Sequence, residues 1–217
     1  MILPALNNPN VLLQAIIAYS IIVLVAFPLH EFAHAWTAVR LGDQTPYYQG
    51  RLTLDPRAHI DPFGALLLAF GGFGWAKPVQ FLPSNLRKAP SIKAGIVLVA
   101  LAGPVMNVLI ATIAALPLRI GGTPFIIANF QLAQILDTIV LINLLLAVFN
   151  MIPLVPLDGS KVLWGIMPSS WSRTYEQVQQ YSFFILIILI FPIGGTSIVG
   201  QIIGPSVGVL HQLLVGF

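Results

Sequence analysis

The stretch that decides the fold is Val11–Leu29, VLLQAIIAYSIIVLVAFPL, which is followed directly by the sequence HEFAH at residues 30–34. About 20 apolar residues are enough to cross a bilayer as a helix, so this stretch predicts a transmembrane helix. Residues 1–29 contain no Asp, Glu, Lys or Arg, whereas a signal peptide would begin with a basic region. We therefore expect the HEFAH motif at the far end of a membrane helix, where ionisable groups are costly and usually functional.

The HEFAH motif has the pattern of a metal site on a helix. Residues four apart share one face, so His30 and His34 can direct one ring nitrogen each at a single ion. Glu31 lies one step round the helix, where its carboxylate can reach a water molecule without being a ligand. Two imidazoles and such a general base are typical of zinc hydrolases. The less favoured interpretation is a pair of histidines that only form hydrogen bonds near a helix end.

Composition indicates an all-α polytopic membrane protein. Charged residues make up 8% of the chain and hydrophobic residues 57%, and the mean hydropathy is +0.90. We expect one domain over residues 1–217, with a core at about 11–165 and C-terminal helices at about 177–217. There is no Cys, so a zinc site must use His and carboxylate ligands. The net charge of +3 fits loops beside anionic lipid better than a nucleic-acid surface.

The loop region after the first helix is rich in positive charge. Seven of the ten basic residues lie between Arg40 and Lys93. By the positive-inside rule this region is cytoplasmic, so the metal motif is expected on the cytoplasmic side of the cell (inner) membrane. Residues 50–55 alternate polar and apolar and predict a short strand. Residues 62–75 are apolar but too few for a span, which predicts a re-entrant or interfacial segment.

Two further spans are expected at 94–118 and at about 132–154. Gly103 and Asn107 share a face of the first of these, where Asn107 has either a packing role or a catalytic one. The second ends in Asn150 and a proline-rich run, and broken backbone at such depth belongs beside a cavity. The uncharged tail contains Pro192, Gly194 and Gly195, which should divide it into two helices.

Asp158 is the best candidate for the third metal ligand. Glu176 is the only glutamate after the HEFAH motif. Asp137 lies roughly 30 Å from Asp158 along a helix that rises 1.5 Å per residue. Asp43, Asp55 and Asp61 have loop or helix-cap explanations, and His211, alone in a tail helix, is most simply a hydrogen-bonded membrane histidine. Asp158 reaches the side of His30 only if residues 62–75 cross the membrane an even number of times or not at all.

Several motifs together resemble the site-2 protease family of intramembrane zinc metalloproteases. They are HEFAHAW at 30–36, RLTLDP at 51–56, HIDPFG at 59–64, GWAKPV at 74–79, GPVMN at 103–107 and NMIPLVPLDG at 150–159. The resemblance is to compact bacterial and archaeal members without PDZ or CBS domains, and covers most of residues 20–165. One departure is Asp55, where the family pattern leads us to expect Asn.

The resemblance implies one zinc ion per chain, held by His30, His34 and Asp158, with Glu31 as general base. It implies that Asn150 and Asn107 position the substrate or stabilise the oxyanion. The substrates would be membrane proteins, cut in or near transmembrane segments after unwinding. The strand at Arg51–Asp55 would pair with the unwound substrate.

Two alternatives belong to other classes: a divalent-metal transporter and an inactive zinc-binding membrane scaffold. A transporter predicts further buried acidic residues, inverted repeats and a His-rich loop, none of which the sequence shows. Substrate identity and oligomeric state are not encoded in any motif.

Overall fold

A continuous helical span of 32 residues carries the HEFAH motif in this computed structural model, which describes residues 7–190 and 197–216. Its parts are α1 (Pro9–Ile21), a π-helical turn (Ile22–Ala26) and α2 (Phe27–Arg40). The wide turn precedes Pro28, which has no N–H and whose ring would collide with the carbonyl four residues back. The expected first membrane helix is confirmed, but it continues to Arg40, so the motif lies within the helix and not at its end.

Four helical spans in the described residues are long and apolar enough to cross a membrane. Besides the first, they are α6 (Ile92–Ala128), α7 (Phe130–Asn150) and α11 (Ile198–Val215). The all-α polytopic architecture is thus confirmed. Helix α6 extends ten residues beyond the expected end and is kinked at Gly122, whose φ of +52° and ψ of −153° are non-helical.

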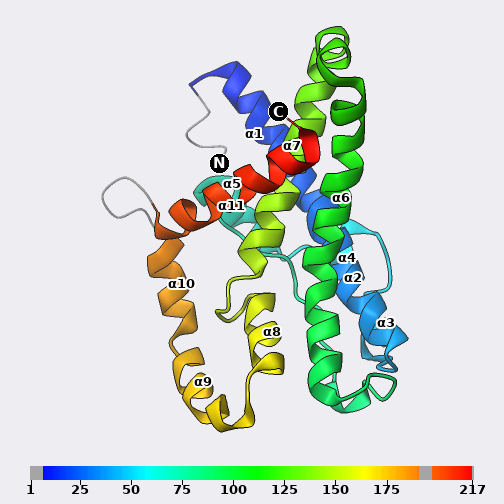
Figure 1. The fold of residues 1–217 in the computed structure, drawn as a ribbon, viewed down its shortest axis with the longest axis vertical. Helices are drawn as coiled ribbons and strands as arrows, with labels where there is room; N and C mark the ends of the chain where they lie inside the picture. Colours follow the sequence, from blue (N-terminus) through cyan, green and yellow to red (C-terminus); the bar gives the residue numbers. More distant parts are fainter. Residues whose placement is uncertain (1–6, 191–196, 217) are drawn as a thin grey trace.

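Helix α6 is the centre of the packing (Figure 1), because α2, α7 and α8 all contact it. The main core lies where α6, α7 and α11 meet, and its largest members are Leu118, Val140, Leu144, Ile203, Val207 and Val215. A second cluster, Ala38, Leu86, Ile96 and Val99, joins α2 to the first turns of α6. These contacts bring the motif helix and the Gly103 face of α6 together.

The expected strand at residues 50–55 is wrong. This segment is irregular and lies between two short helices, α3 (Thr45–Tyr48) and α4 (Pro56–His59). No strand occurs among the described residues, where the only pairing of strand type is the isolated bridge between Ile60 and Ala76. Alternation over six residues cannot form a sheet without a partner strand.

The expected re-entrant path of residues 62–75 is not supported either. Residues Pro62–Gly71 form α5, whose ten residues are too few to cross a bilayer, and Gly72 ends it with φ +76°. Residues 73–82 then continue as irregular chain, with Ala76 bridged to Ile60, to a 3₁₀ turn at Pro83–Asn85.

The third span ends at Asn150, earlier than expected, and the two prolines of residues 151–157 keep the chain irregular until the next helix. Four short helices follow: α8 (Asp158–Ile166), a 3₁₀ turn (Ser169–Trp171), α9 (Ser172–Gln179) and α10 (Ser182–Ile190). Helices α10 and α11 lie on either side of the expected division of the tail. The division itself, at Pro192, Gly194 and Gly195, falls outside the described residues.

Candidate metal centre

The two histidines of α2 face each other inside the protein. His30 and His34 are buried, and their Nε2 atoms are 3.0 Å apart. Their rings meet edge to face. The spacing of four residues produces this geometry directly, because α2 is regular through the motif.

Asp158 joins them from the first residue of α8. Its Oδ2 atom is 3.2 Å from His30 Nε2 and 3.0 Å from His34 Nε2. The other oxygen, Oδ1, accepts a hydrogen bond of 3.2 Å from Lys161 Nζ one turn later. The proline-rich run after α7 turns the chain back, and packing of α8 on α6 brings the start of α8 to α2. The structure therefore places the three sequence-predicted ligands around one point.

The outer ring nitrogens fix the tautomers. His30 Nδ1 is 2.6 Å from the side-chain amide oxygen, Oδ1, of Asn107. His34 Nδ1 is 2.6 Å from the backbone oxygen of Val99. Both partners are acceptors, so each neutral ring carries its hydrogen on Nδ1 and turns a lone pair inward from Nε2. Two lone pairs and a carboxylate oxygen then converge, which is favourable only around a cation.

This donor set fits zinc. Nitrogen and oxygen ligands at 2.0–2.2 Å from a tetrahedral zinc ion lie about 3.3 to 3.6 Å from one another, a separation that a small outward shift of the side chains would reach. The three inward atoms of His30, His34 and Asp158 are 3.0–3.2 Å apart. A group of His30, Glu31 and His34 also has ligand atoms within 4.8 Å of one another, so Glu31 is the only rival for the third position that the described residues offer. The shorter distances favour Asp158.

Glu31 is buried next to the histidines but is held from another direction. Its Oε2 atom accepts a 2.9 Å hydrogen bond from the backbone N–H of Val79, which lies in the irregular chain after α5. A carboxylate that is fixed beside a metal site without being its nearest ligand is suited to take a proton from water.

Asn107 contacts His30 and does not face open space. Its Oδ1 accepts from His30, and its Nδ2 donates to Asn143 Oδ1 at 2.8 Å. Asn143 in turn donates to the carbonyl of Ile139 at 2.9 Å. Asn107 and Asn143 are both fully buried. Asn107 thus lies behind His30, in contact with its outer ring nitrogen. Asn143 is a residue that sequence reasoning missed, and its only signal was a polar side chain within the apolar run that follows Asp137 in α7.

Asn150 lies near the site with its amide turned away. Its Nδ2 donates to Leu146 of its own helix at 2.9 Å. Asn150 nevertheless lines a cavity of about 390 Å³, and His30 and Glu31 line the same cavity. Phe73, Trp75 and Phe149 give this cavity aromatic walls. Helix α10 closes this cavity with Phe183 and Leu186.

The remaining candidates lie elsewhere. Asp55 and Asp61 cap the N-termini of α4 and α5, as expected. His59 is fully buried, with Nε2 2.8 Å from the carbonyl of Thr53. His211 is hydrogen-bonded, as expected: its Nε2 lies 2.6 Å from Asp137 Oδ1, and the two residues lie on other helices than the metal motif.

Gly103 of α6 packs directly on both imidazoles. A Cβ atom at this position would lie 2.4 Å from His34 Nε2 and 2.6 Å from His30 Nε2, which is closer than nonbonded atoms approach. Sequence reasoning had placed Gly103 at a helix contact, and the structure shows that the contact is with the candidate ligands themselves.

Gly103→Ala is therefore expected to lower zinc affinity at least tenfold, since the ligand rings must move to admit the methyl group. The measurement is zinc content after dialysis of purified protein against a mild chelator. Gly204→Ala is the matched control, because a Cβ there meets no atom within 4 Å. Equal zinc retention by both variants would show that α6 does not constrain the site.

Comparison with known proteins matches the chain to a peptidase family and to proteins named as zinc metalloproteases. Residues 117–193, which include Asn150 and Asp158, match the model of Peptidase family M50. "Putative zinc metalloprotease YwhC" of Bacillus subtilis is 38% identical over 179 residues, which is 80% of this chain and 80% of that protein.

More distant relatives carry a similar name. Rip2 of Mycobacterium tuberculosis is 29% identical over 171 residues, covering 76% of this chain and 63% of that protein. Rip2 of Mycolicibacterium smegmatis is 27% identical over 172 residues, covering 77% of this chain and 64% of that protein. Both carry the name "Putative zinc metalloprotease Rip2". No solved structure matches the chain.

Proposed function

Because this chain belongs to peptidase family M50, the site-2 protease family, we propose that it is a zinc-dependent endopeptidase that cuts membrane proteins in or next to their transmembrane segments. The observation that carries the proposal is the convergence of His30 Nε2, His34 Nε2 and Asp158 Oδ2 beside the carboxylate of Glu31. The site adjoins an apolar cavity and lies among helices of transmembrane length.

In this proposal His30, His34 and Asp158 hold one zinc ion per chain. When bound, zinc supplies Lewis-acid chemistry, which makes water a stronger nucleophile near neutral pH and polarises the peptide carbonyl. Glu31 removes the proton from the attacking water and then delivers it to the leaving amine. Asn107 and the Val99 carbonyl keep the ring hydrogens on Nδ1, so both Nε2 lone pairs stay inward.

Asn150 is proposed as a donor to the developing oxyanion, because it lines the same cavity as His30 and Glu31. To do this its amide must leave the Leu146 carbonyl and rotate into the cavity. The aromatic walls of the cavity suit the apolar side chains of an unwound transmembrane segment.

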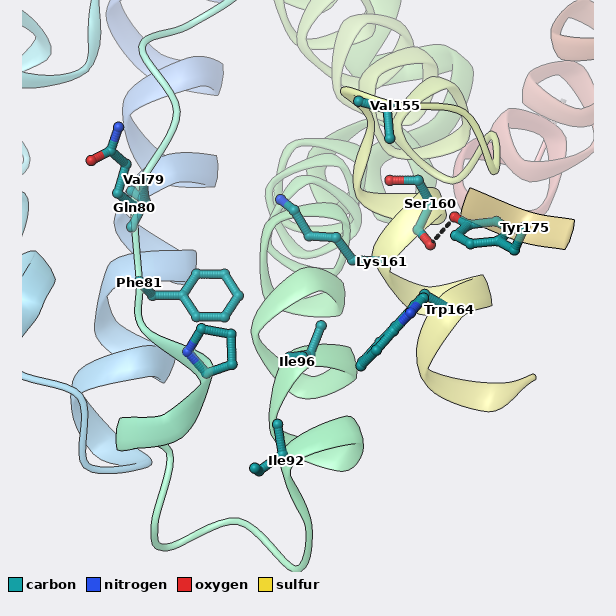
Figure 2. A pocket seen from close by; sticks show the side chains of 11 residues that line it. Val79, Gln80, Phe81, Ile92, Ile96, Val155, Ser160, Lys161, Trp164 and Tyr175 are labelled. Atoms are coloured by element: carbon teal, nitrogen blue, oxygen red, sulfur yellow. Dashed lines mark hydrogen bonds between the residues drawn. The ribbon is translucent and has the colours of Figure 1, made fainter. Parts of the chain in front are cut away.

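A second groove of about 630 Å³ lies next to the first cavity, because Val79 and Val155 line the groove and their chain neighbours Pro78 and Pro156 line the cavity (Figure 2). Val79, Gln80 and Phe81 form one wall, and Lys161 and Trp164 lie across from them. Among the described residues, the backbone of Gln80 has no hydrogen-bond partner. We place strand pairing with the substrate here, in place of the strand first expected at residues 51–55.

The test is cleavage, in detergent, of a fluorogenic peptide of about 20 apolar residues with glycine at its centre. Zinc removal should abolish cleavage, and zinc return should restore it. Proteoliposomes containing the protein are assayed for zinc uptake in parallel. Uptake without cleavage would support a transporter, and zinc binding with neither activity would support an inactive scaffold.

We further propose that the site lies toward the cytoplasm, and Cys labelling tests this cleanly because the chain has no Cys. In intact cells, Ser84→Cys in the exposed turn before α6 should react only with membrane-permeant maleimide. Thr123→Cys is the control that the impermeant reagent should reach. Thr123 lies about 45 Å from the first residue of α6, because each helical residue adds 1.5 Å. The reverse labelling pattern would place the site on the outer side.

A further inference from the structure

Two buried charged residues outside the metal centre hold one short segment of chain, residues 77–82, which we name the strap. Asp43 is fully buried and Arg51 is 5% exposed. Neither has a side-chain partner of opposite charge among the described residues. A buried charge without a counter-charge is costly, so hydrogen bonds to other groups must compensate for it.

Asp43 fixes the C-terminal end of the strap. Its Oδ2 accepts from the backbone N–H of Leu82 at 2.6 Å, and its Oδ1 accepts from the side chain of Asn85 at 3.1 Å. The backbone and side chain of Thr45 supply two further donors. One carboxylate thus joins the loop after α2 to the end of the strap.

The protonation state of Asp43 suits this role. Burial acts to raise its pKa, but the hydrogen bonds from Thr45, Leu82 and Asn85 together hold that pKa below its ordinary value. Its contribution to stability is therefore complete above the ordinary carboxyl pKa and is lost only as the pH falls through the lowered pKa. The connection is intact throughout the neutral range.

Arg51 fixes the N-terminal end. Its Nη1 donates to the carbonyl of Lys77 at 3.1 Å and to that of Ala58, and its Nη2 donates to Pro78 at 3.5 Å. The backbone N–H of Lys77 also donates to the backbone carbonyl of His59 at 2.8 Å. Burial lowers the pKa of Arg51, and the negative charge of Glu31 partly opposes that shift.

Between these two ends the strap makes one hydrogen bond to the metal centre among the residues that the structure describes. The N–H of Val79 donates to Glu31 Oε2 at 2.9 Å. If either end of the strap is released, this donor loses its fixed position relative to α2. The general base then loses the hydrogen bond that orients it.

We propose that Asp43 and Arg51 are positioning residues that hold the strap so that Val79 orients the general base Glu31. This rests on the proposed function, and it assigns a purpose to two buried charges that the metal centre itself does not use. His30, His34 and Asp158 are held by α2 and α8, so releasing the strap should impair catalysis and leave zinc binding intact.

The test uses Asp43→Asn and Arg51→Lys in the full chain. Asn keeps one acceptor oxygen but turns an N–H₂ group toward the Leu82 N–H, and Lys loses the fork that reaches several carbonyls. The matched controls are Asp55→Asn and Arg57→Lys, which change an exposed ion pair in the same loop region. Each protein is measured for zinc content, for backbone hydrogen exchange of a peptide covering residues 77–82, and for kcat and KM on the fluorogenic peptide.

Both strap variants should keep the zinc content of the parent, exchange residues 77–82 at least tenfold faster and lose about 10- to 100-fold in kcat. The controls should match the parent. Unchanged exchange or unchanged kcat would overturn the proposal, as would loss of zinc in step with activity, because that is the signature of a merely structural role.

Val79→Pro is the decisive second variant if a buried-charge variant does not fold. It removes the N–H that reaches Glu31 and changes none of the side chains that hold the two ends of the strap. Unchanged hydrogen exchange of the Leu82 amide confirms that the strap is still held. Its kcat should fall as in the other variants, with zinc retained, and a parent-like kcat would refute the proposal. Absence of cleavage by the zinc-loaded parent would count against the proposed function instead, and hydrogen exchange in Asp43→Asn would then decide whether the strap is held as described.

Discussion

Glu31→Gln should bind zinc as the parent does and lose peptide hydrolysis by a factor of about 10² to 10⁴. Gln keeps an oxygen that can accept the Val79 N–H, so the local fold is retained. It cannot accept a proton from water at neutral pH, so the step that generates the nucleophile is lost. The histidines and Asp158 are unchanged, which is why zinc should stay.

The two measurements are zinc content by elemental analysis and single-turnover cleavage of the fluorogenic peptide. Glu176→Gln is the matched control, since Glu176 is the other glutamate of the chain and is exposed on α9. Loss of zinc from Glu31→Gln in proportion to the loss of activity would make Glu31 a ligand and not a base. Full activity in Glu31→Gln would remove it from the mechanism.

Asp158→Ala should lower zinc affinity by about 100-fold or more and eliminate cleavage. The effect exceeds the 10- to 100-fold typical of residues that merely support a ligand, because a direct contact is lost. The carboxylate also offsets part of the charge of the ion at a buried position, where an open charge is costly. Asp158→Asn keeps the shape and one neutral oxygen, so it should bind zinc more tightly than the alanine variant and more weakly than the parent.

Zinc retention is measured after dialysis against a mild chelator, with Asp137→Asn as the control. Asp137 also lies beside a histidine, His211, but on other helices, so its variant should keep zinc. Parent-like retention by both Asp158 variants would mean that another group completes the site. The next residue to test would then be Glu31, whose carboxylate lies within 4.8 Å of the histidine ligand atoms. His59 is not the next candidate, because its Nε2 is directed to the carbonyl of Thr53.

Local sequence determined the parts of this protein that depend on helical periodicity and on hydrophobic length. The spacing of His30 and His34 places two imidazoles on one face of any helix, so their pairing needed no tertiary information. The long uncharged runs determined the membrane class and the approximate positions of the spans, because the bilayer requires about 20 apolar residues per helix. Prolines 153 and 156 marked the break after α7, since proline cannot continue a helix.

Pattern reasoning failed where a segment depends on a distant partner. Alternation at residues 50–55 predicted a strand, but Arg51 turns inward to bind carbonyls of residues 58, 77 and 78, and the part of the chain that the structure describes offers no second strand beside it. A strand needs a partner to satisfy its backbone, and a hydrophobic pattern of six residues does not specify one.

Only the tertiary structure decided how the metal centre is supported. The partners of the two histidines are Asn107 and the carbonyl of Val99, 77 and 65 residues away in the sequence, and α6 supplies both. Gly103 is needed because α6 approaches the rings within van der Waals contact, and Val79 reaches Glu31 from a loop with no regular structure. Such contacts arise when helices pack at particular depths and rotations, which depend on the sum of many weak interactions along each interface and not on any short motif.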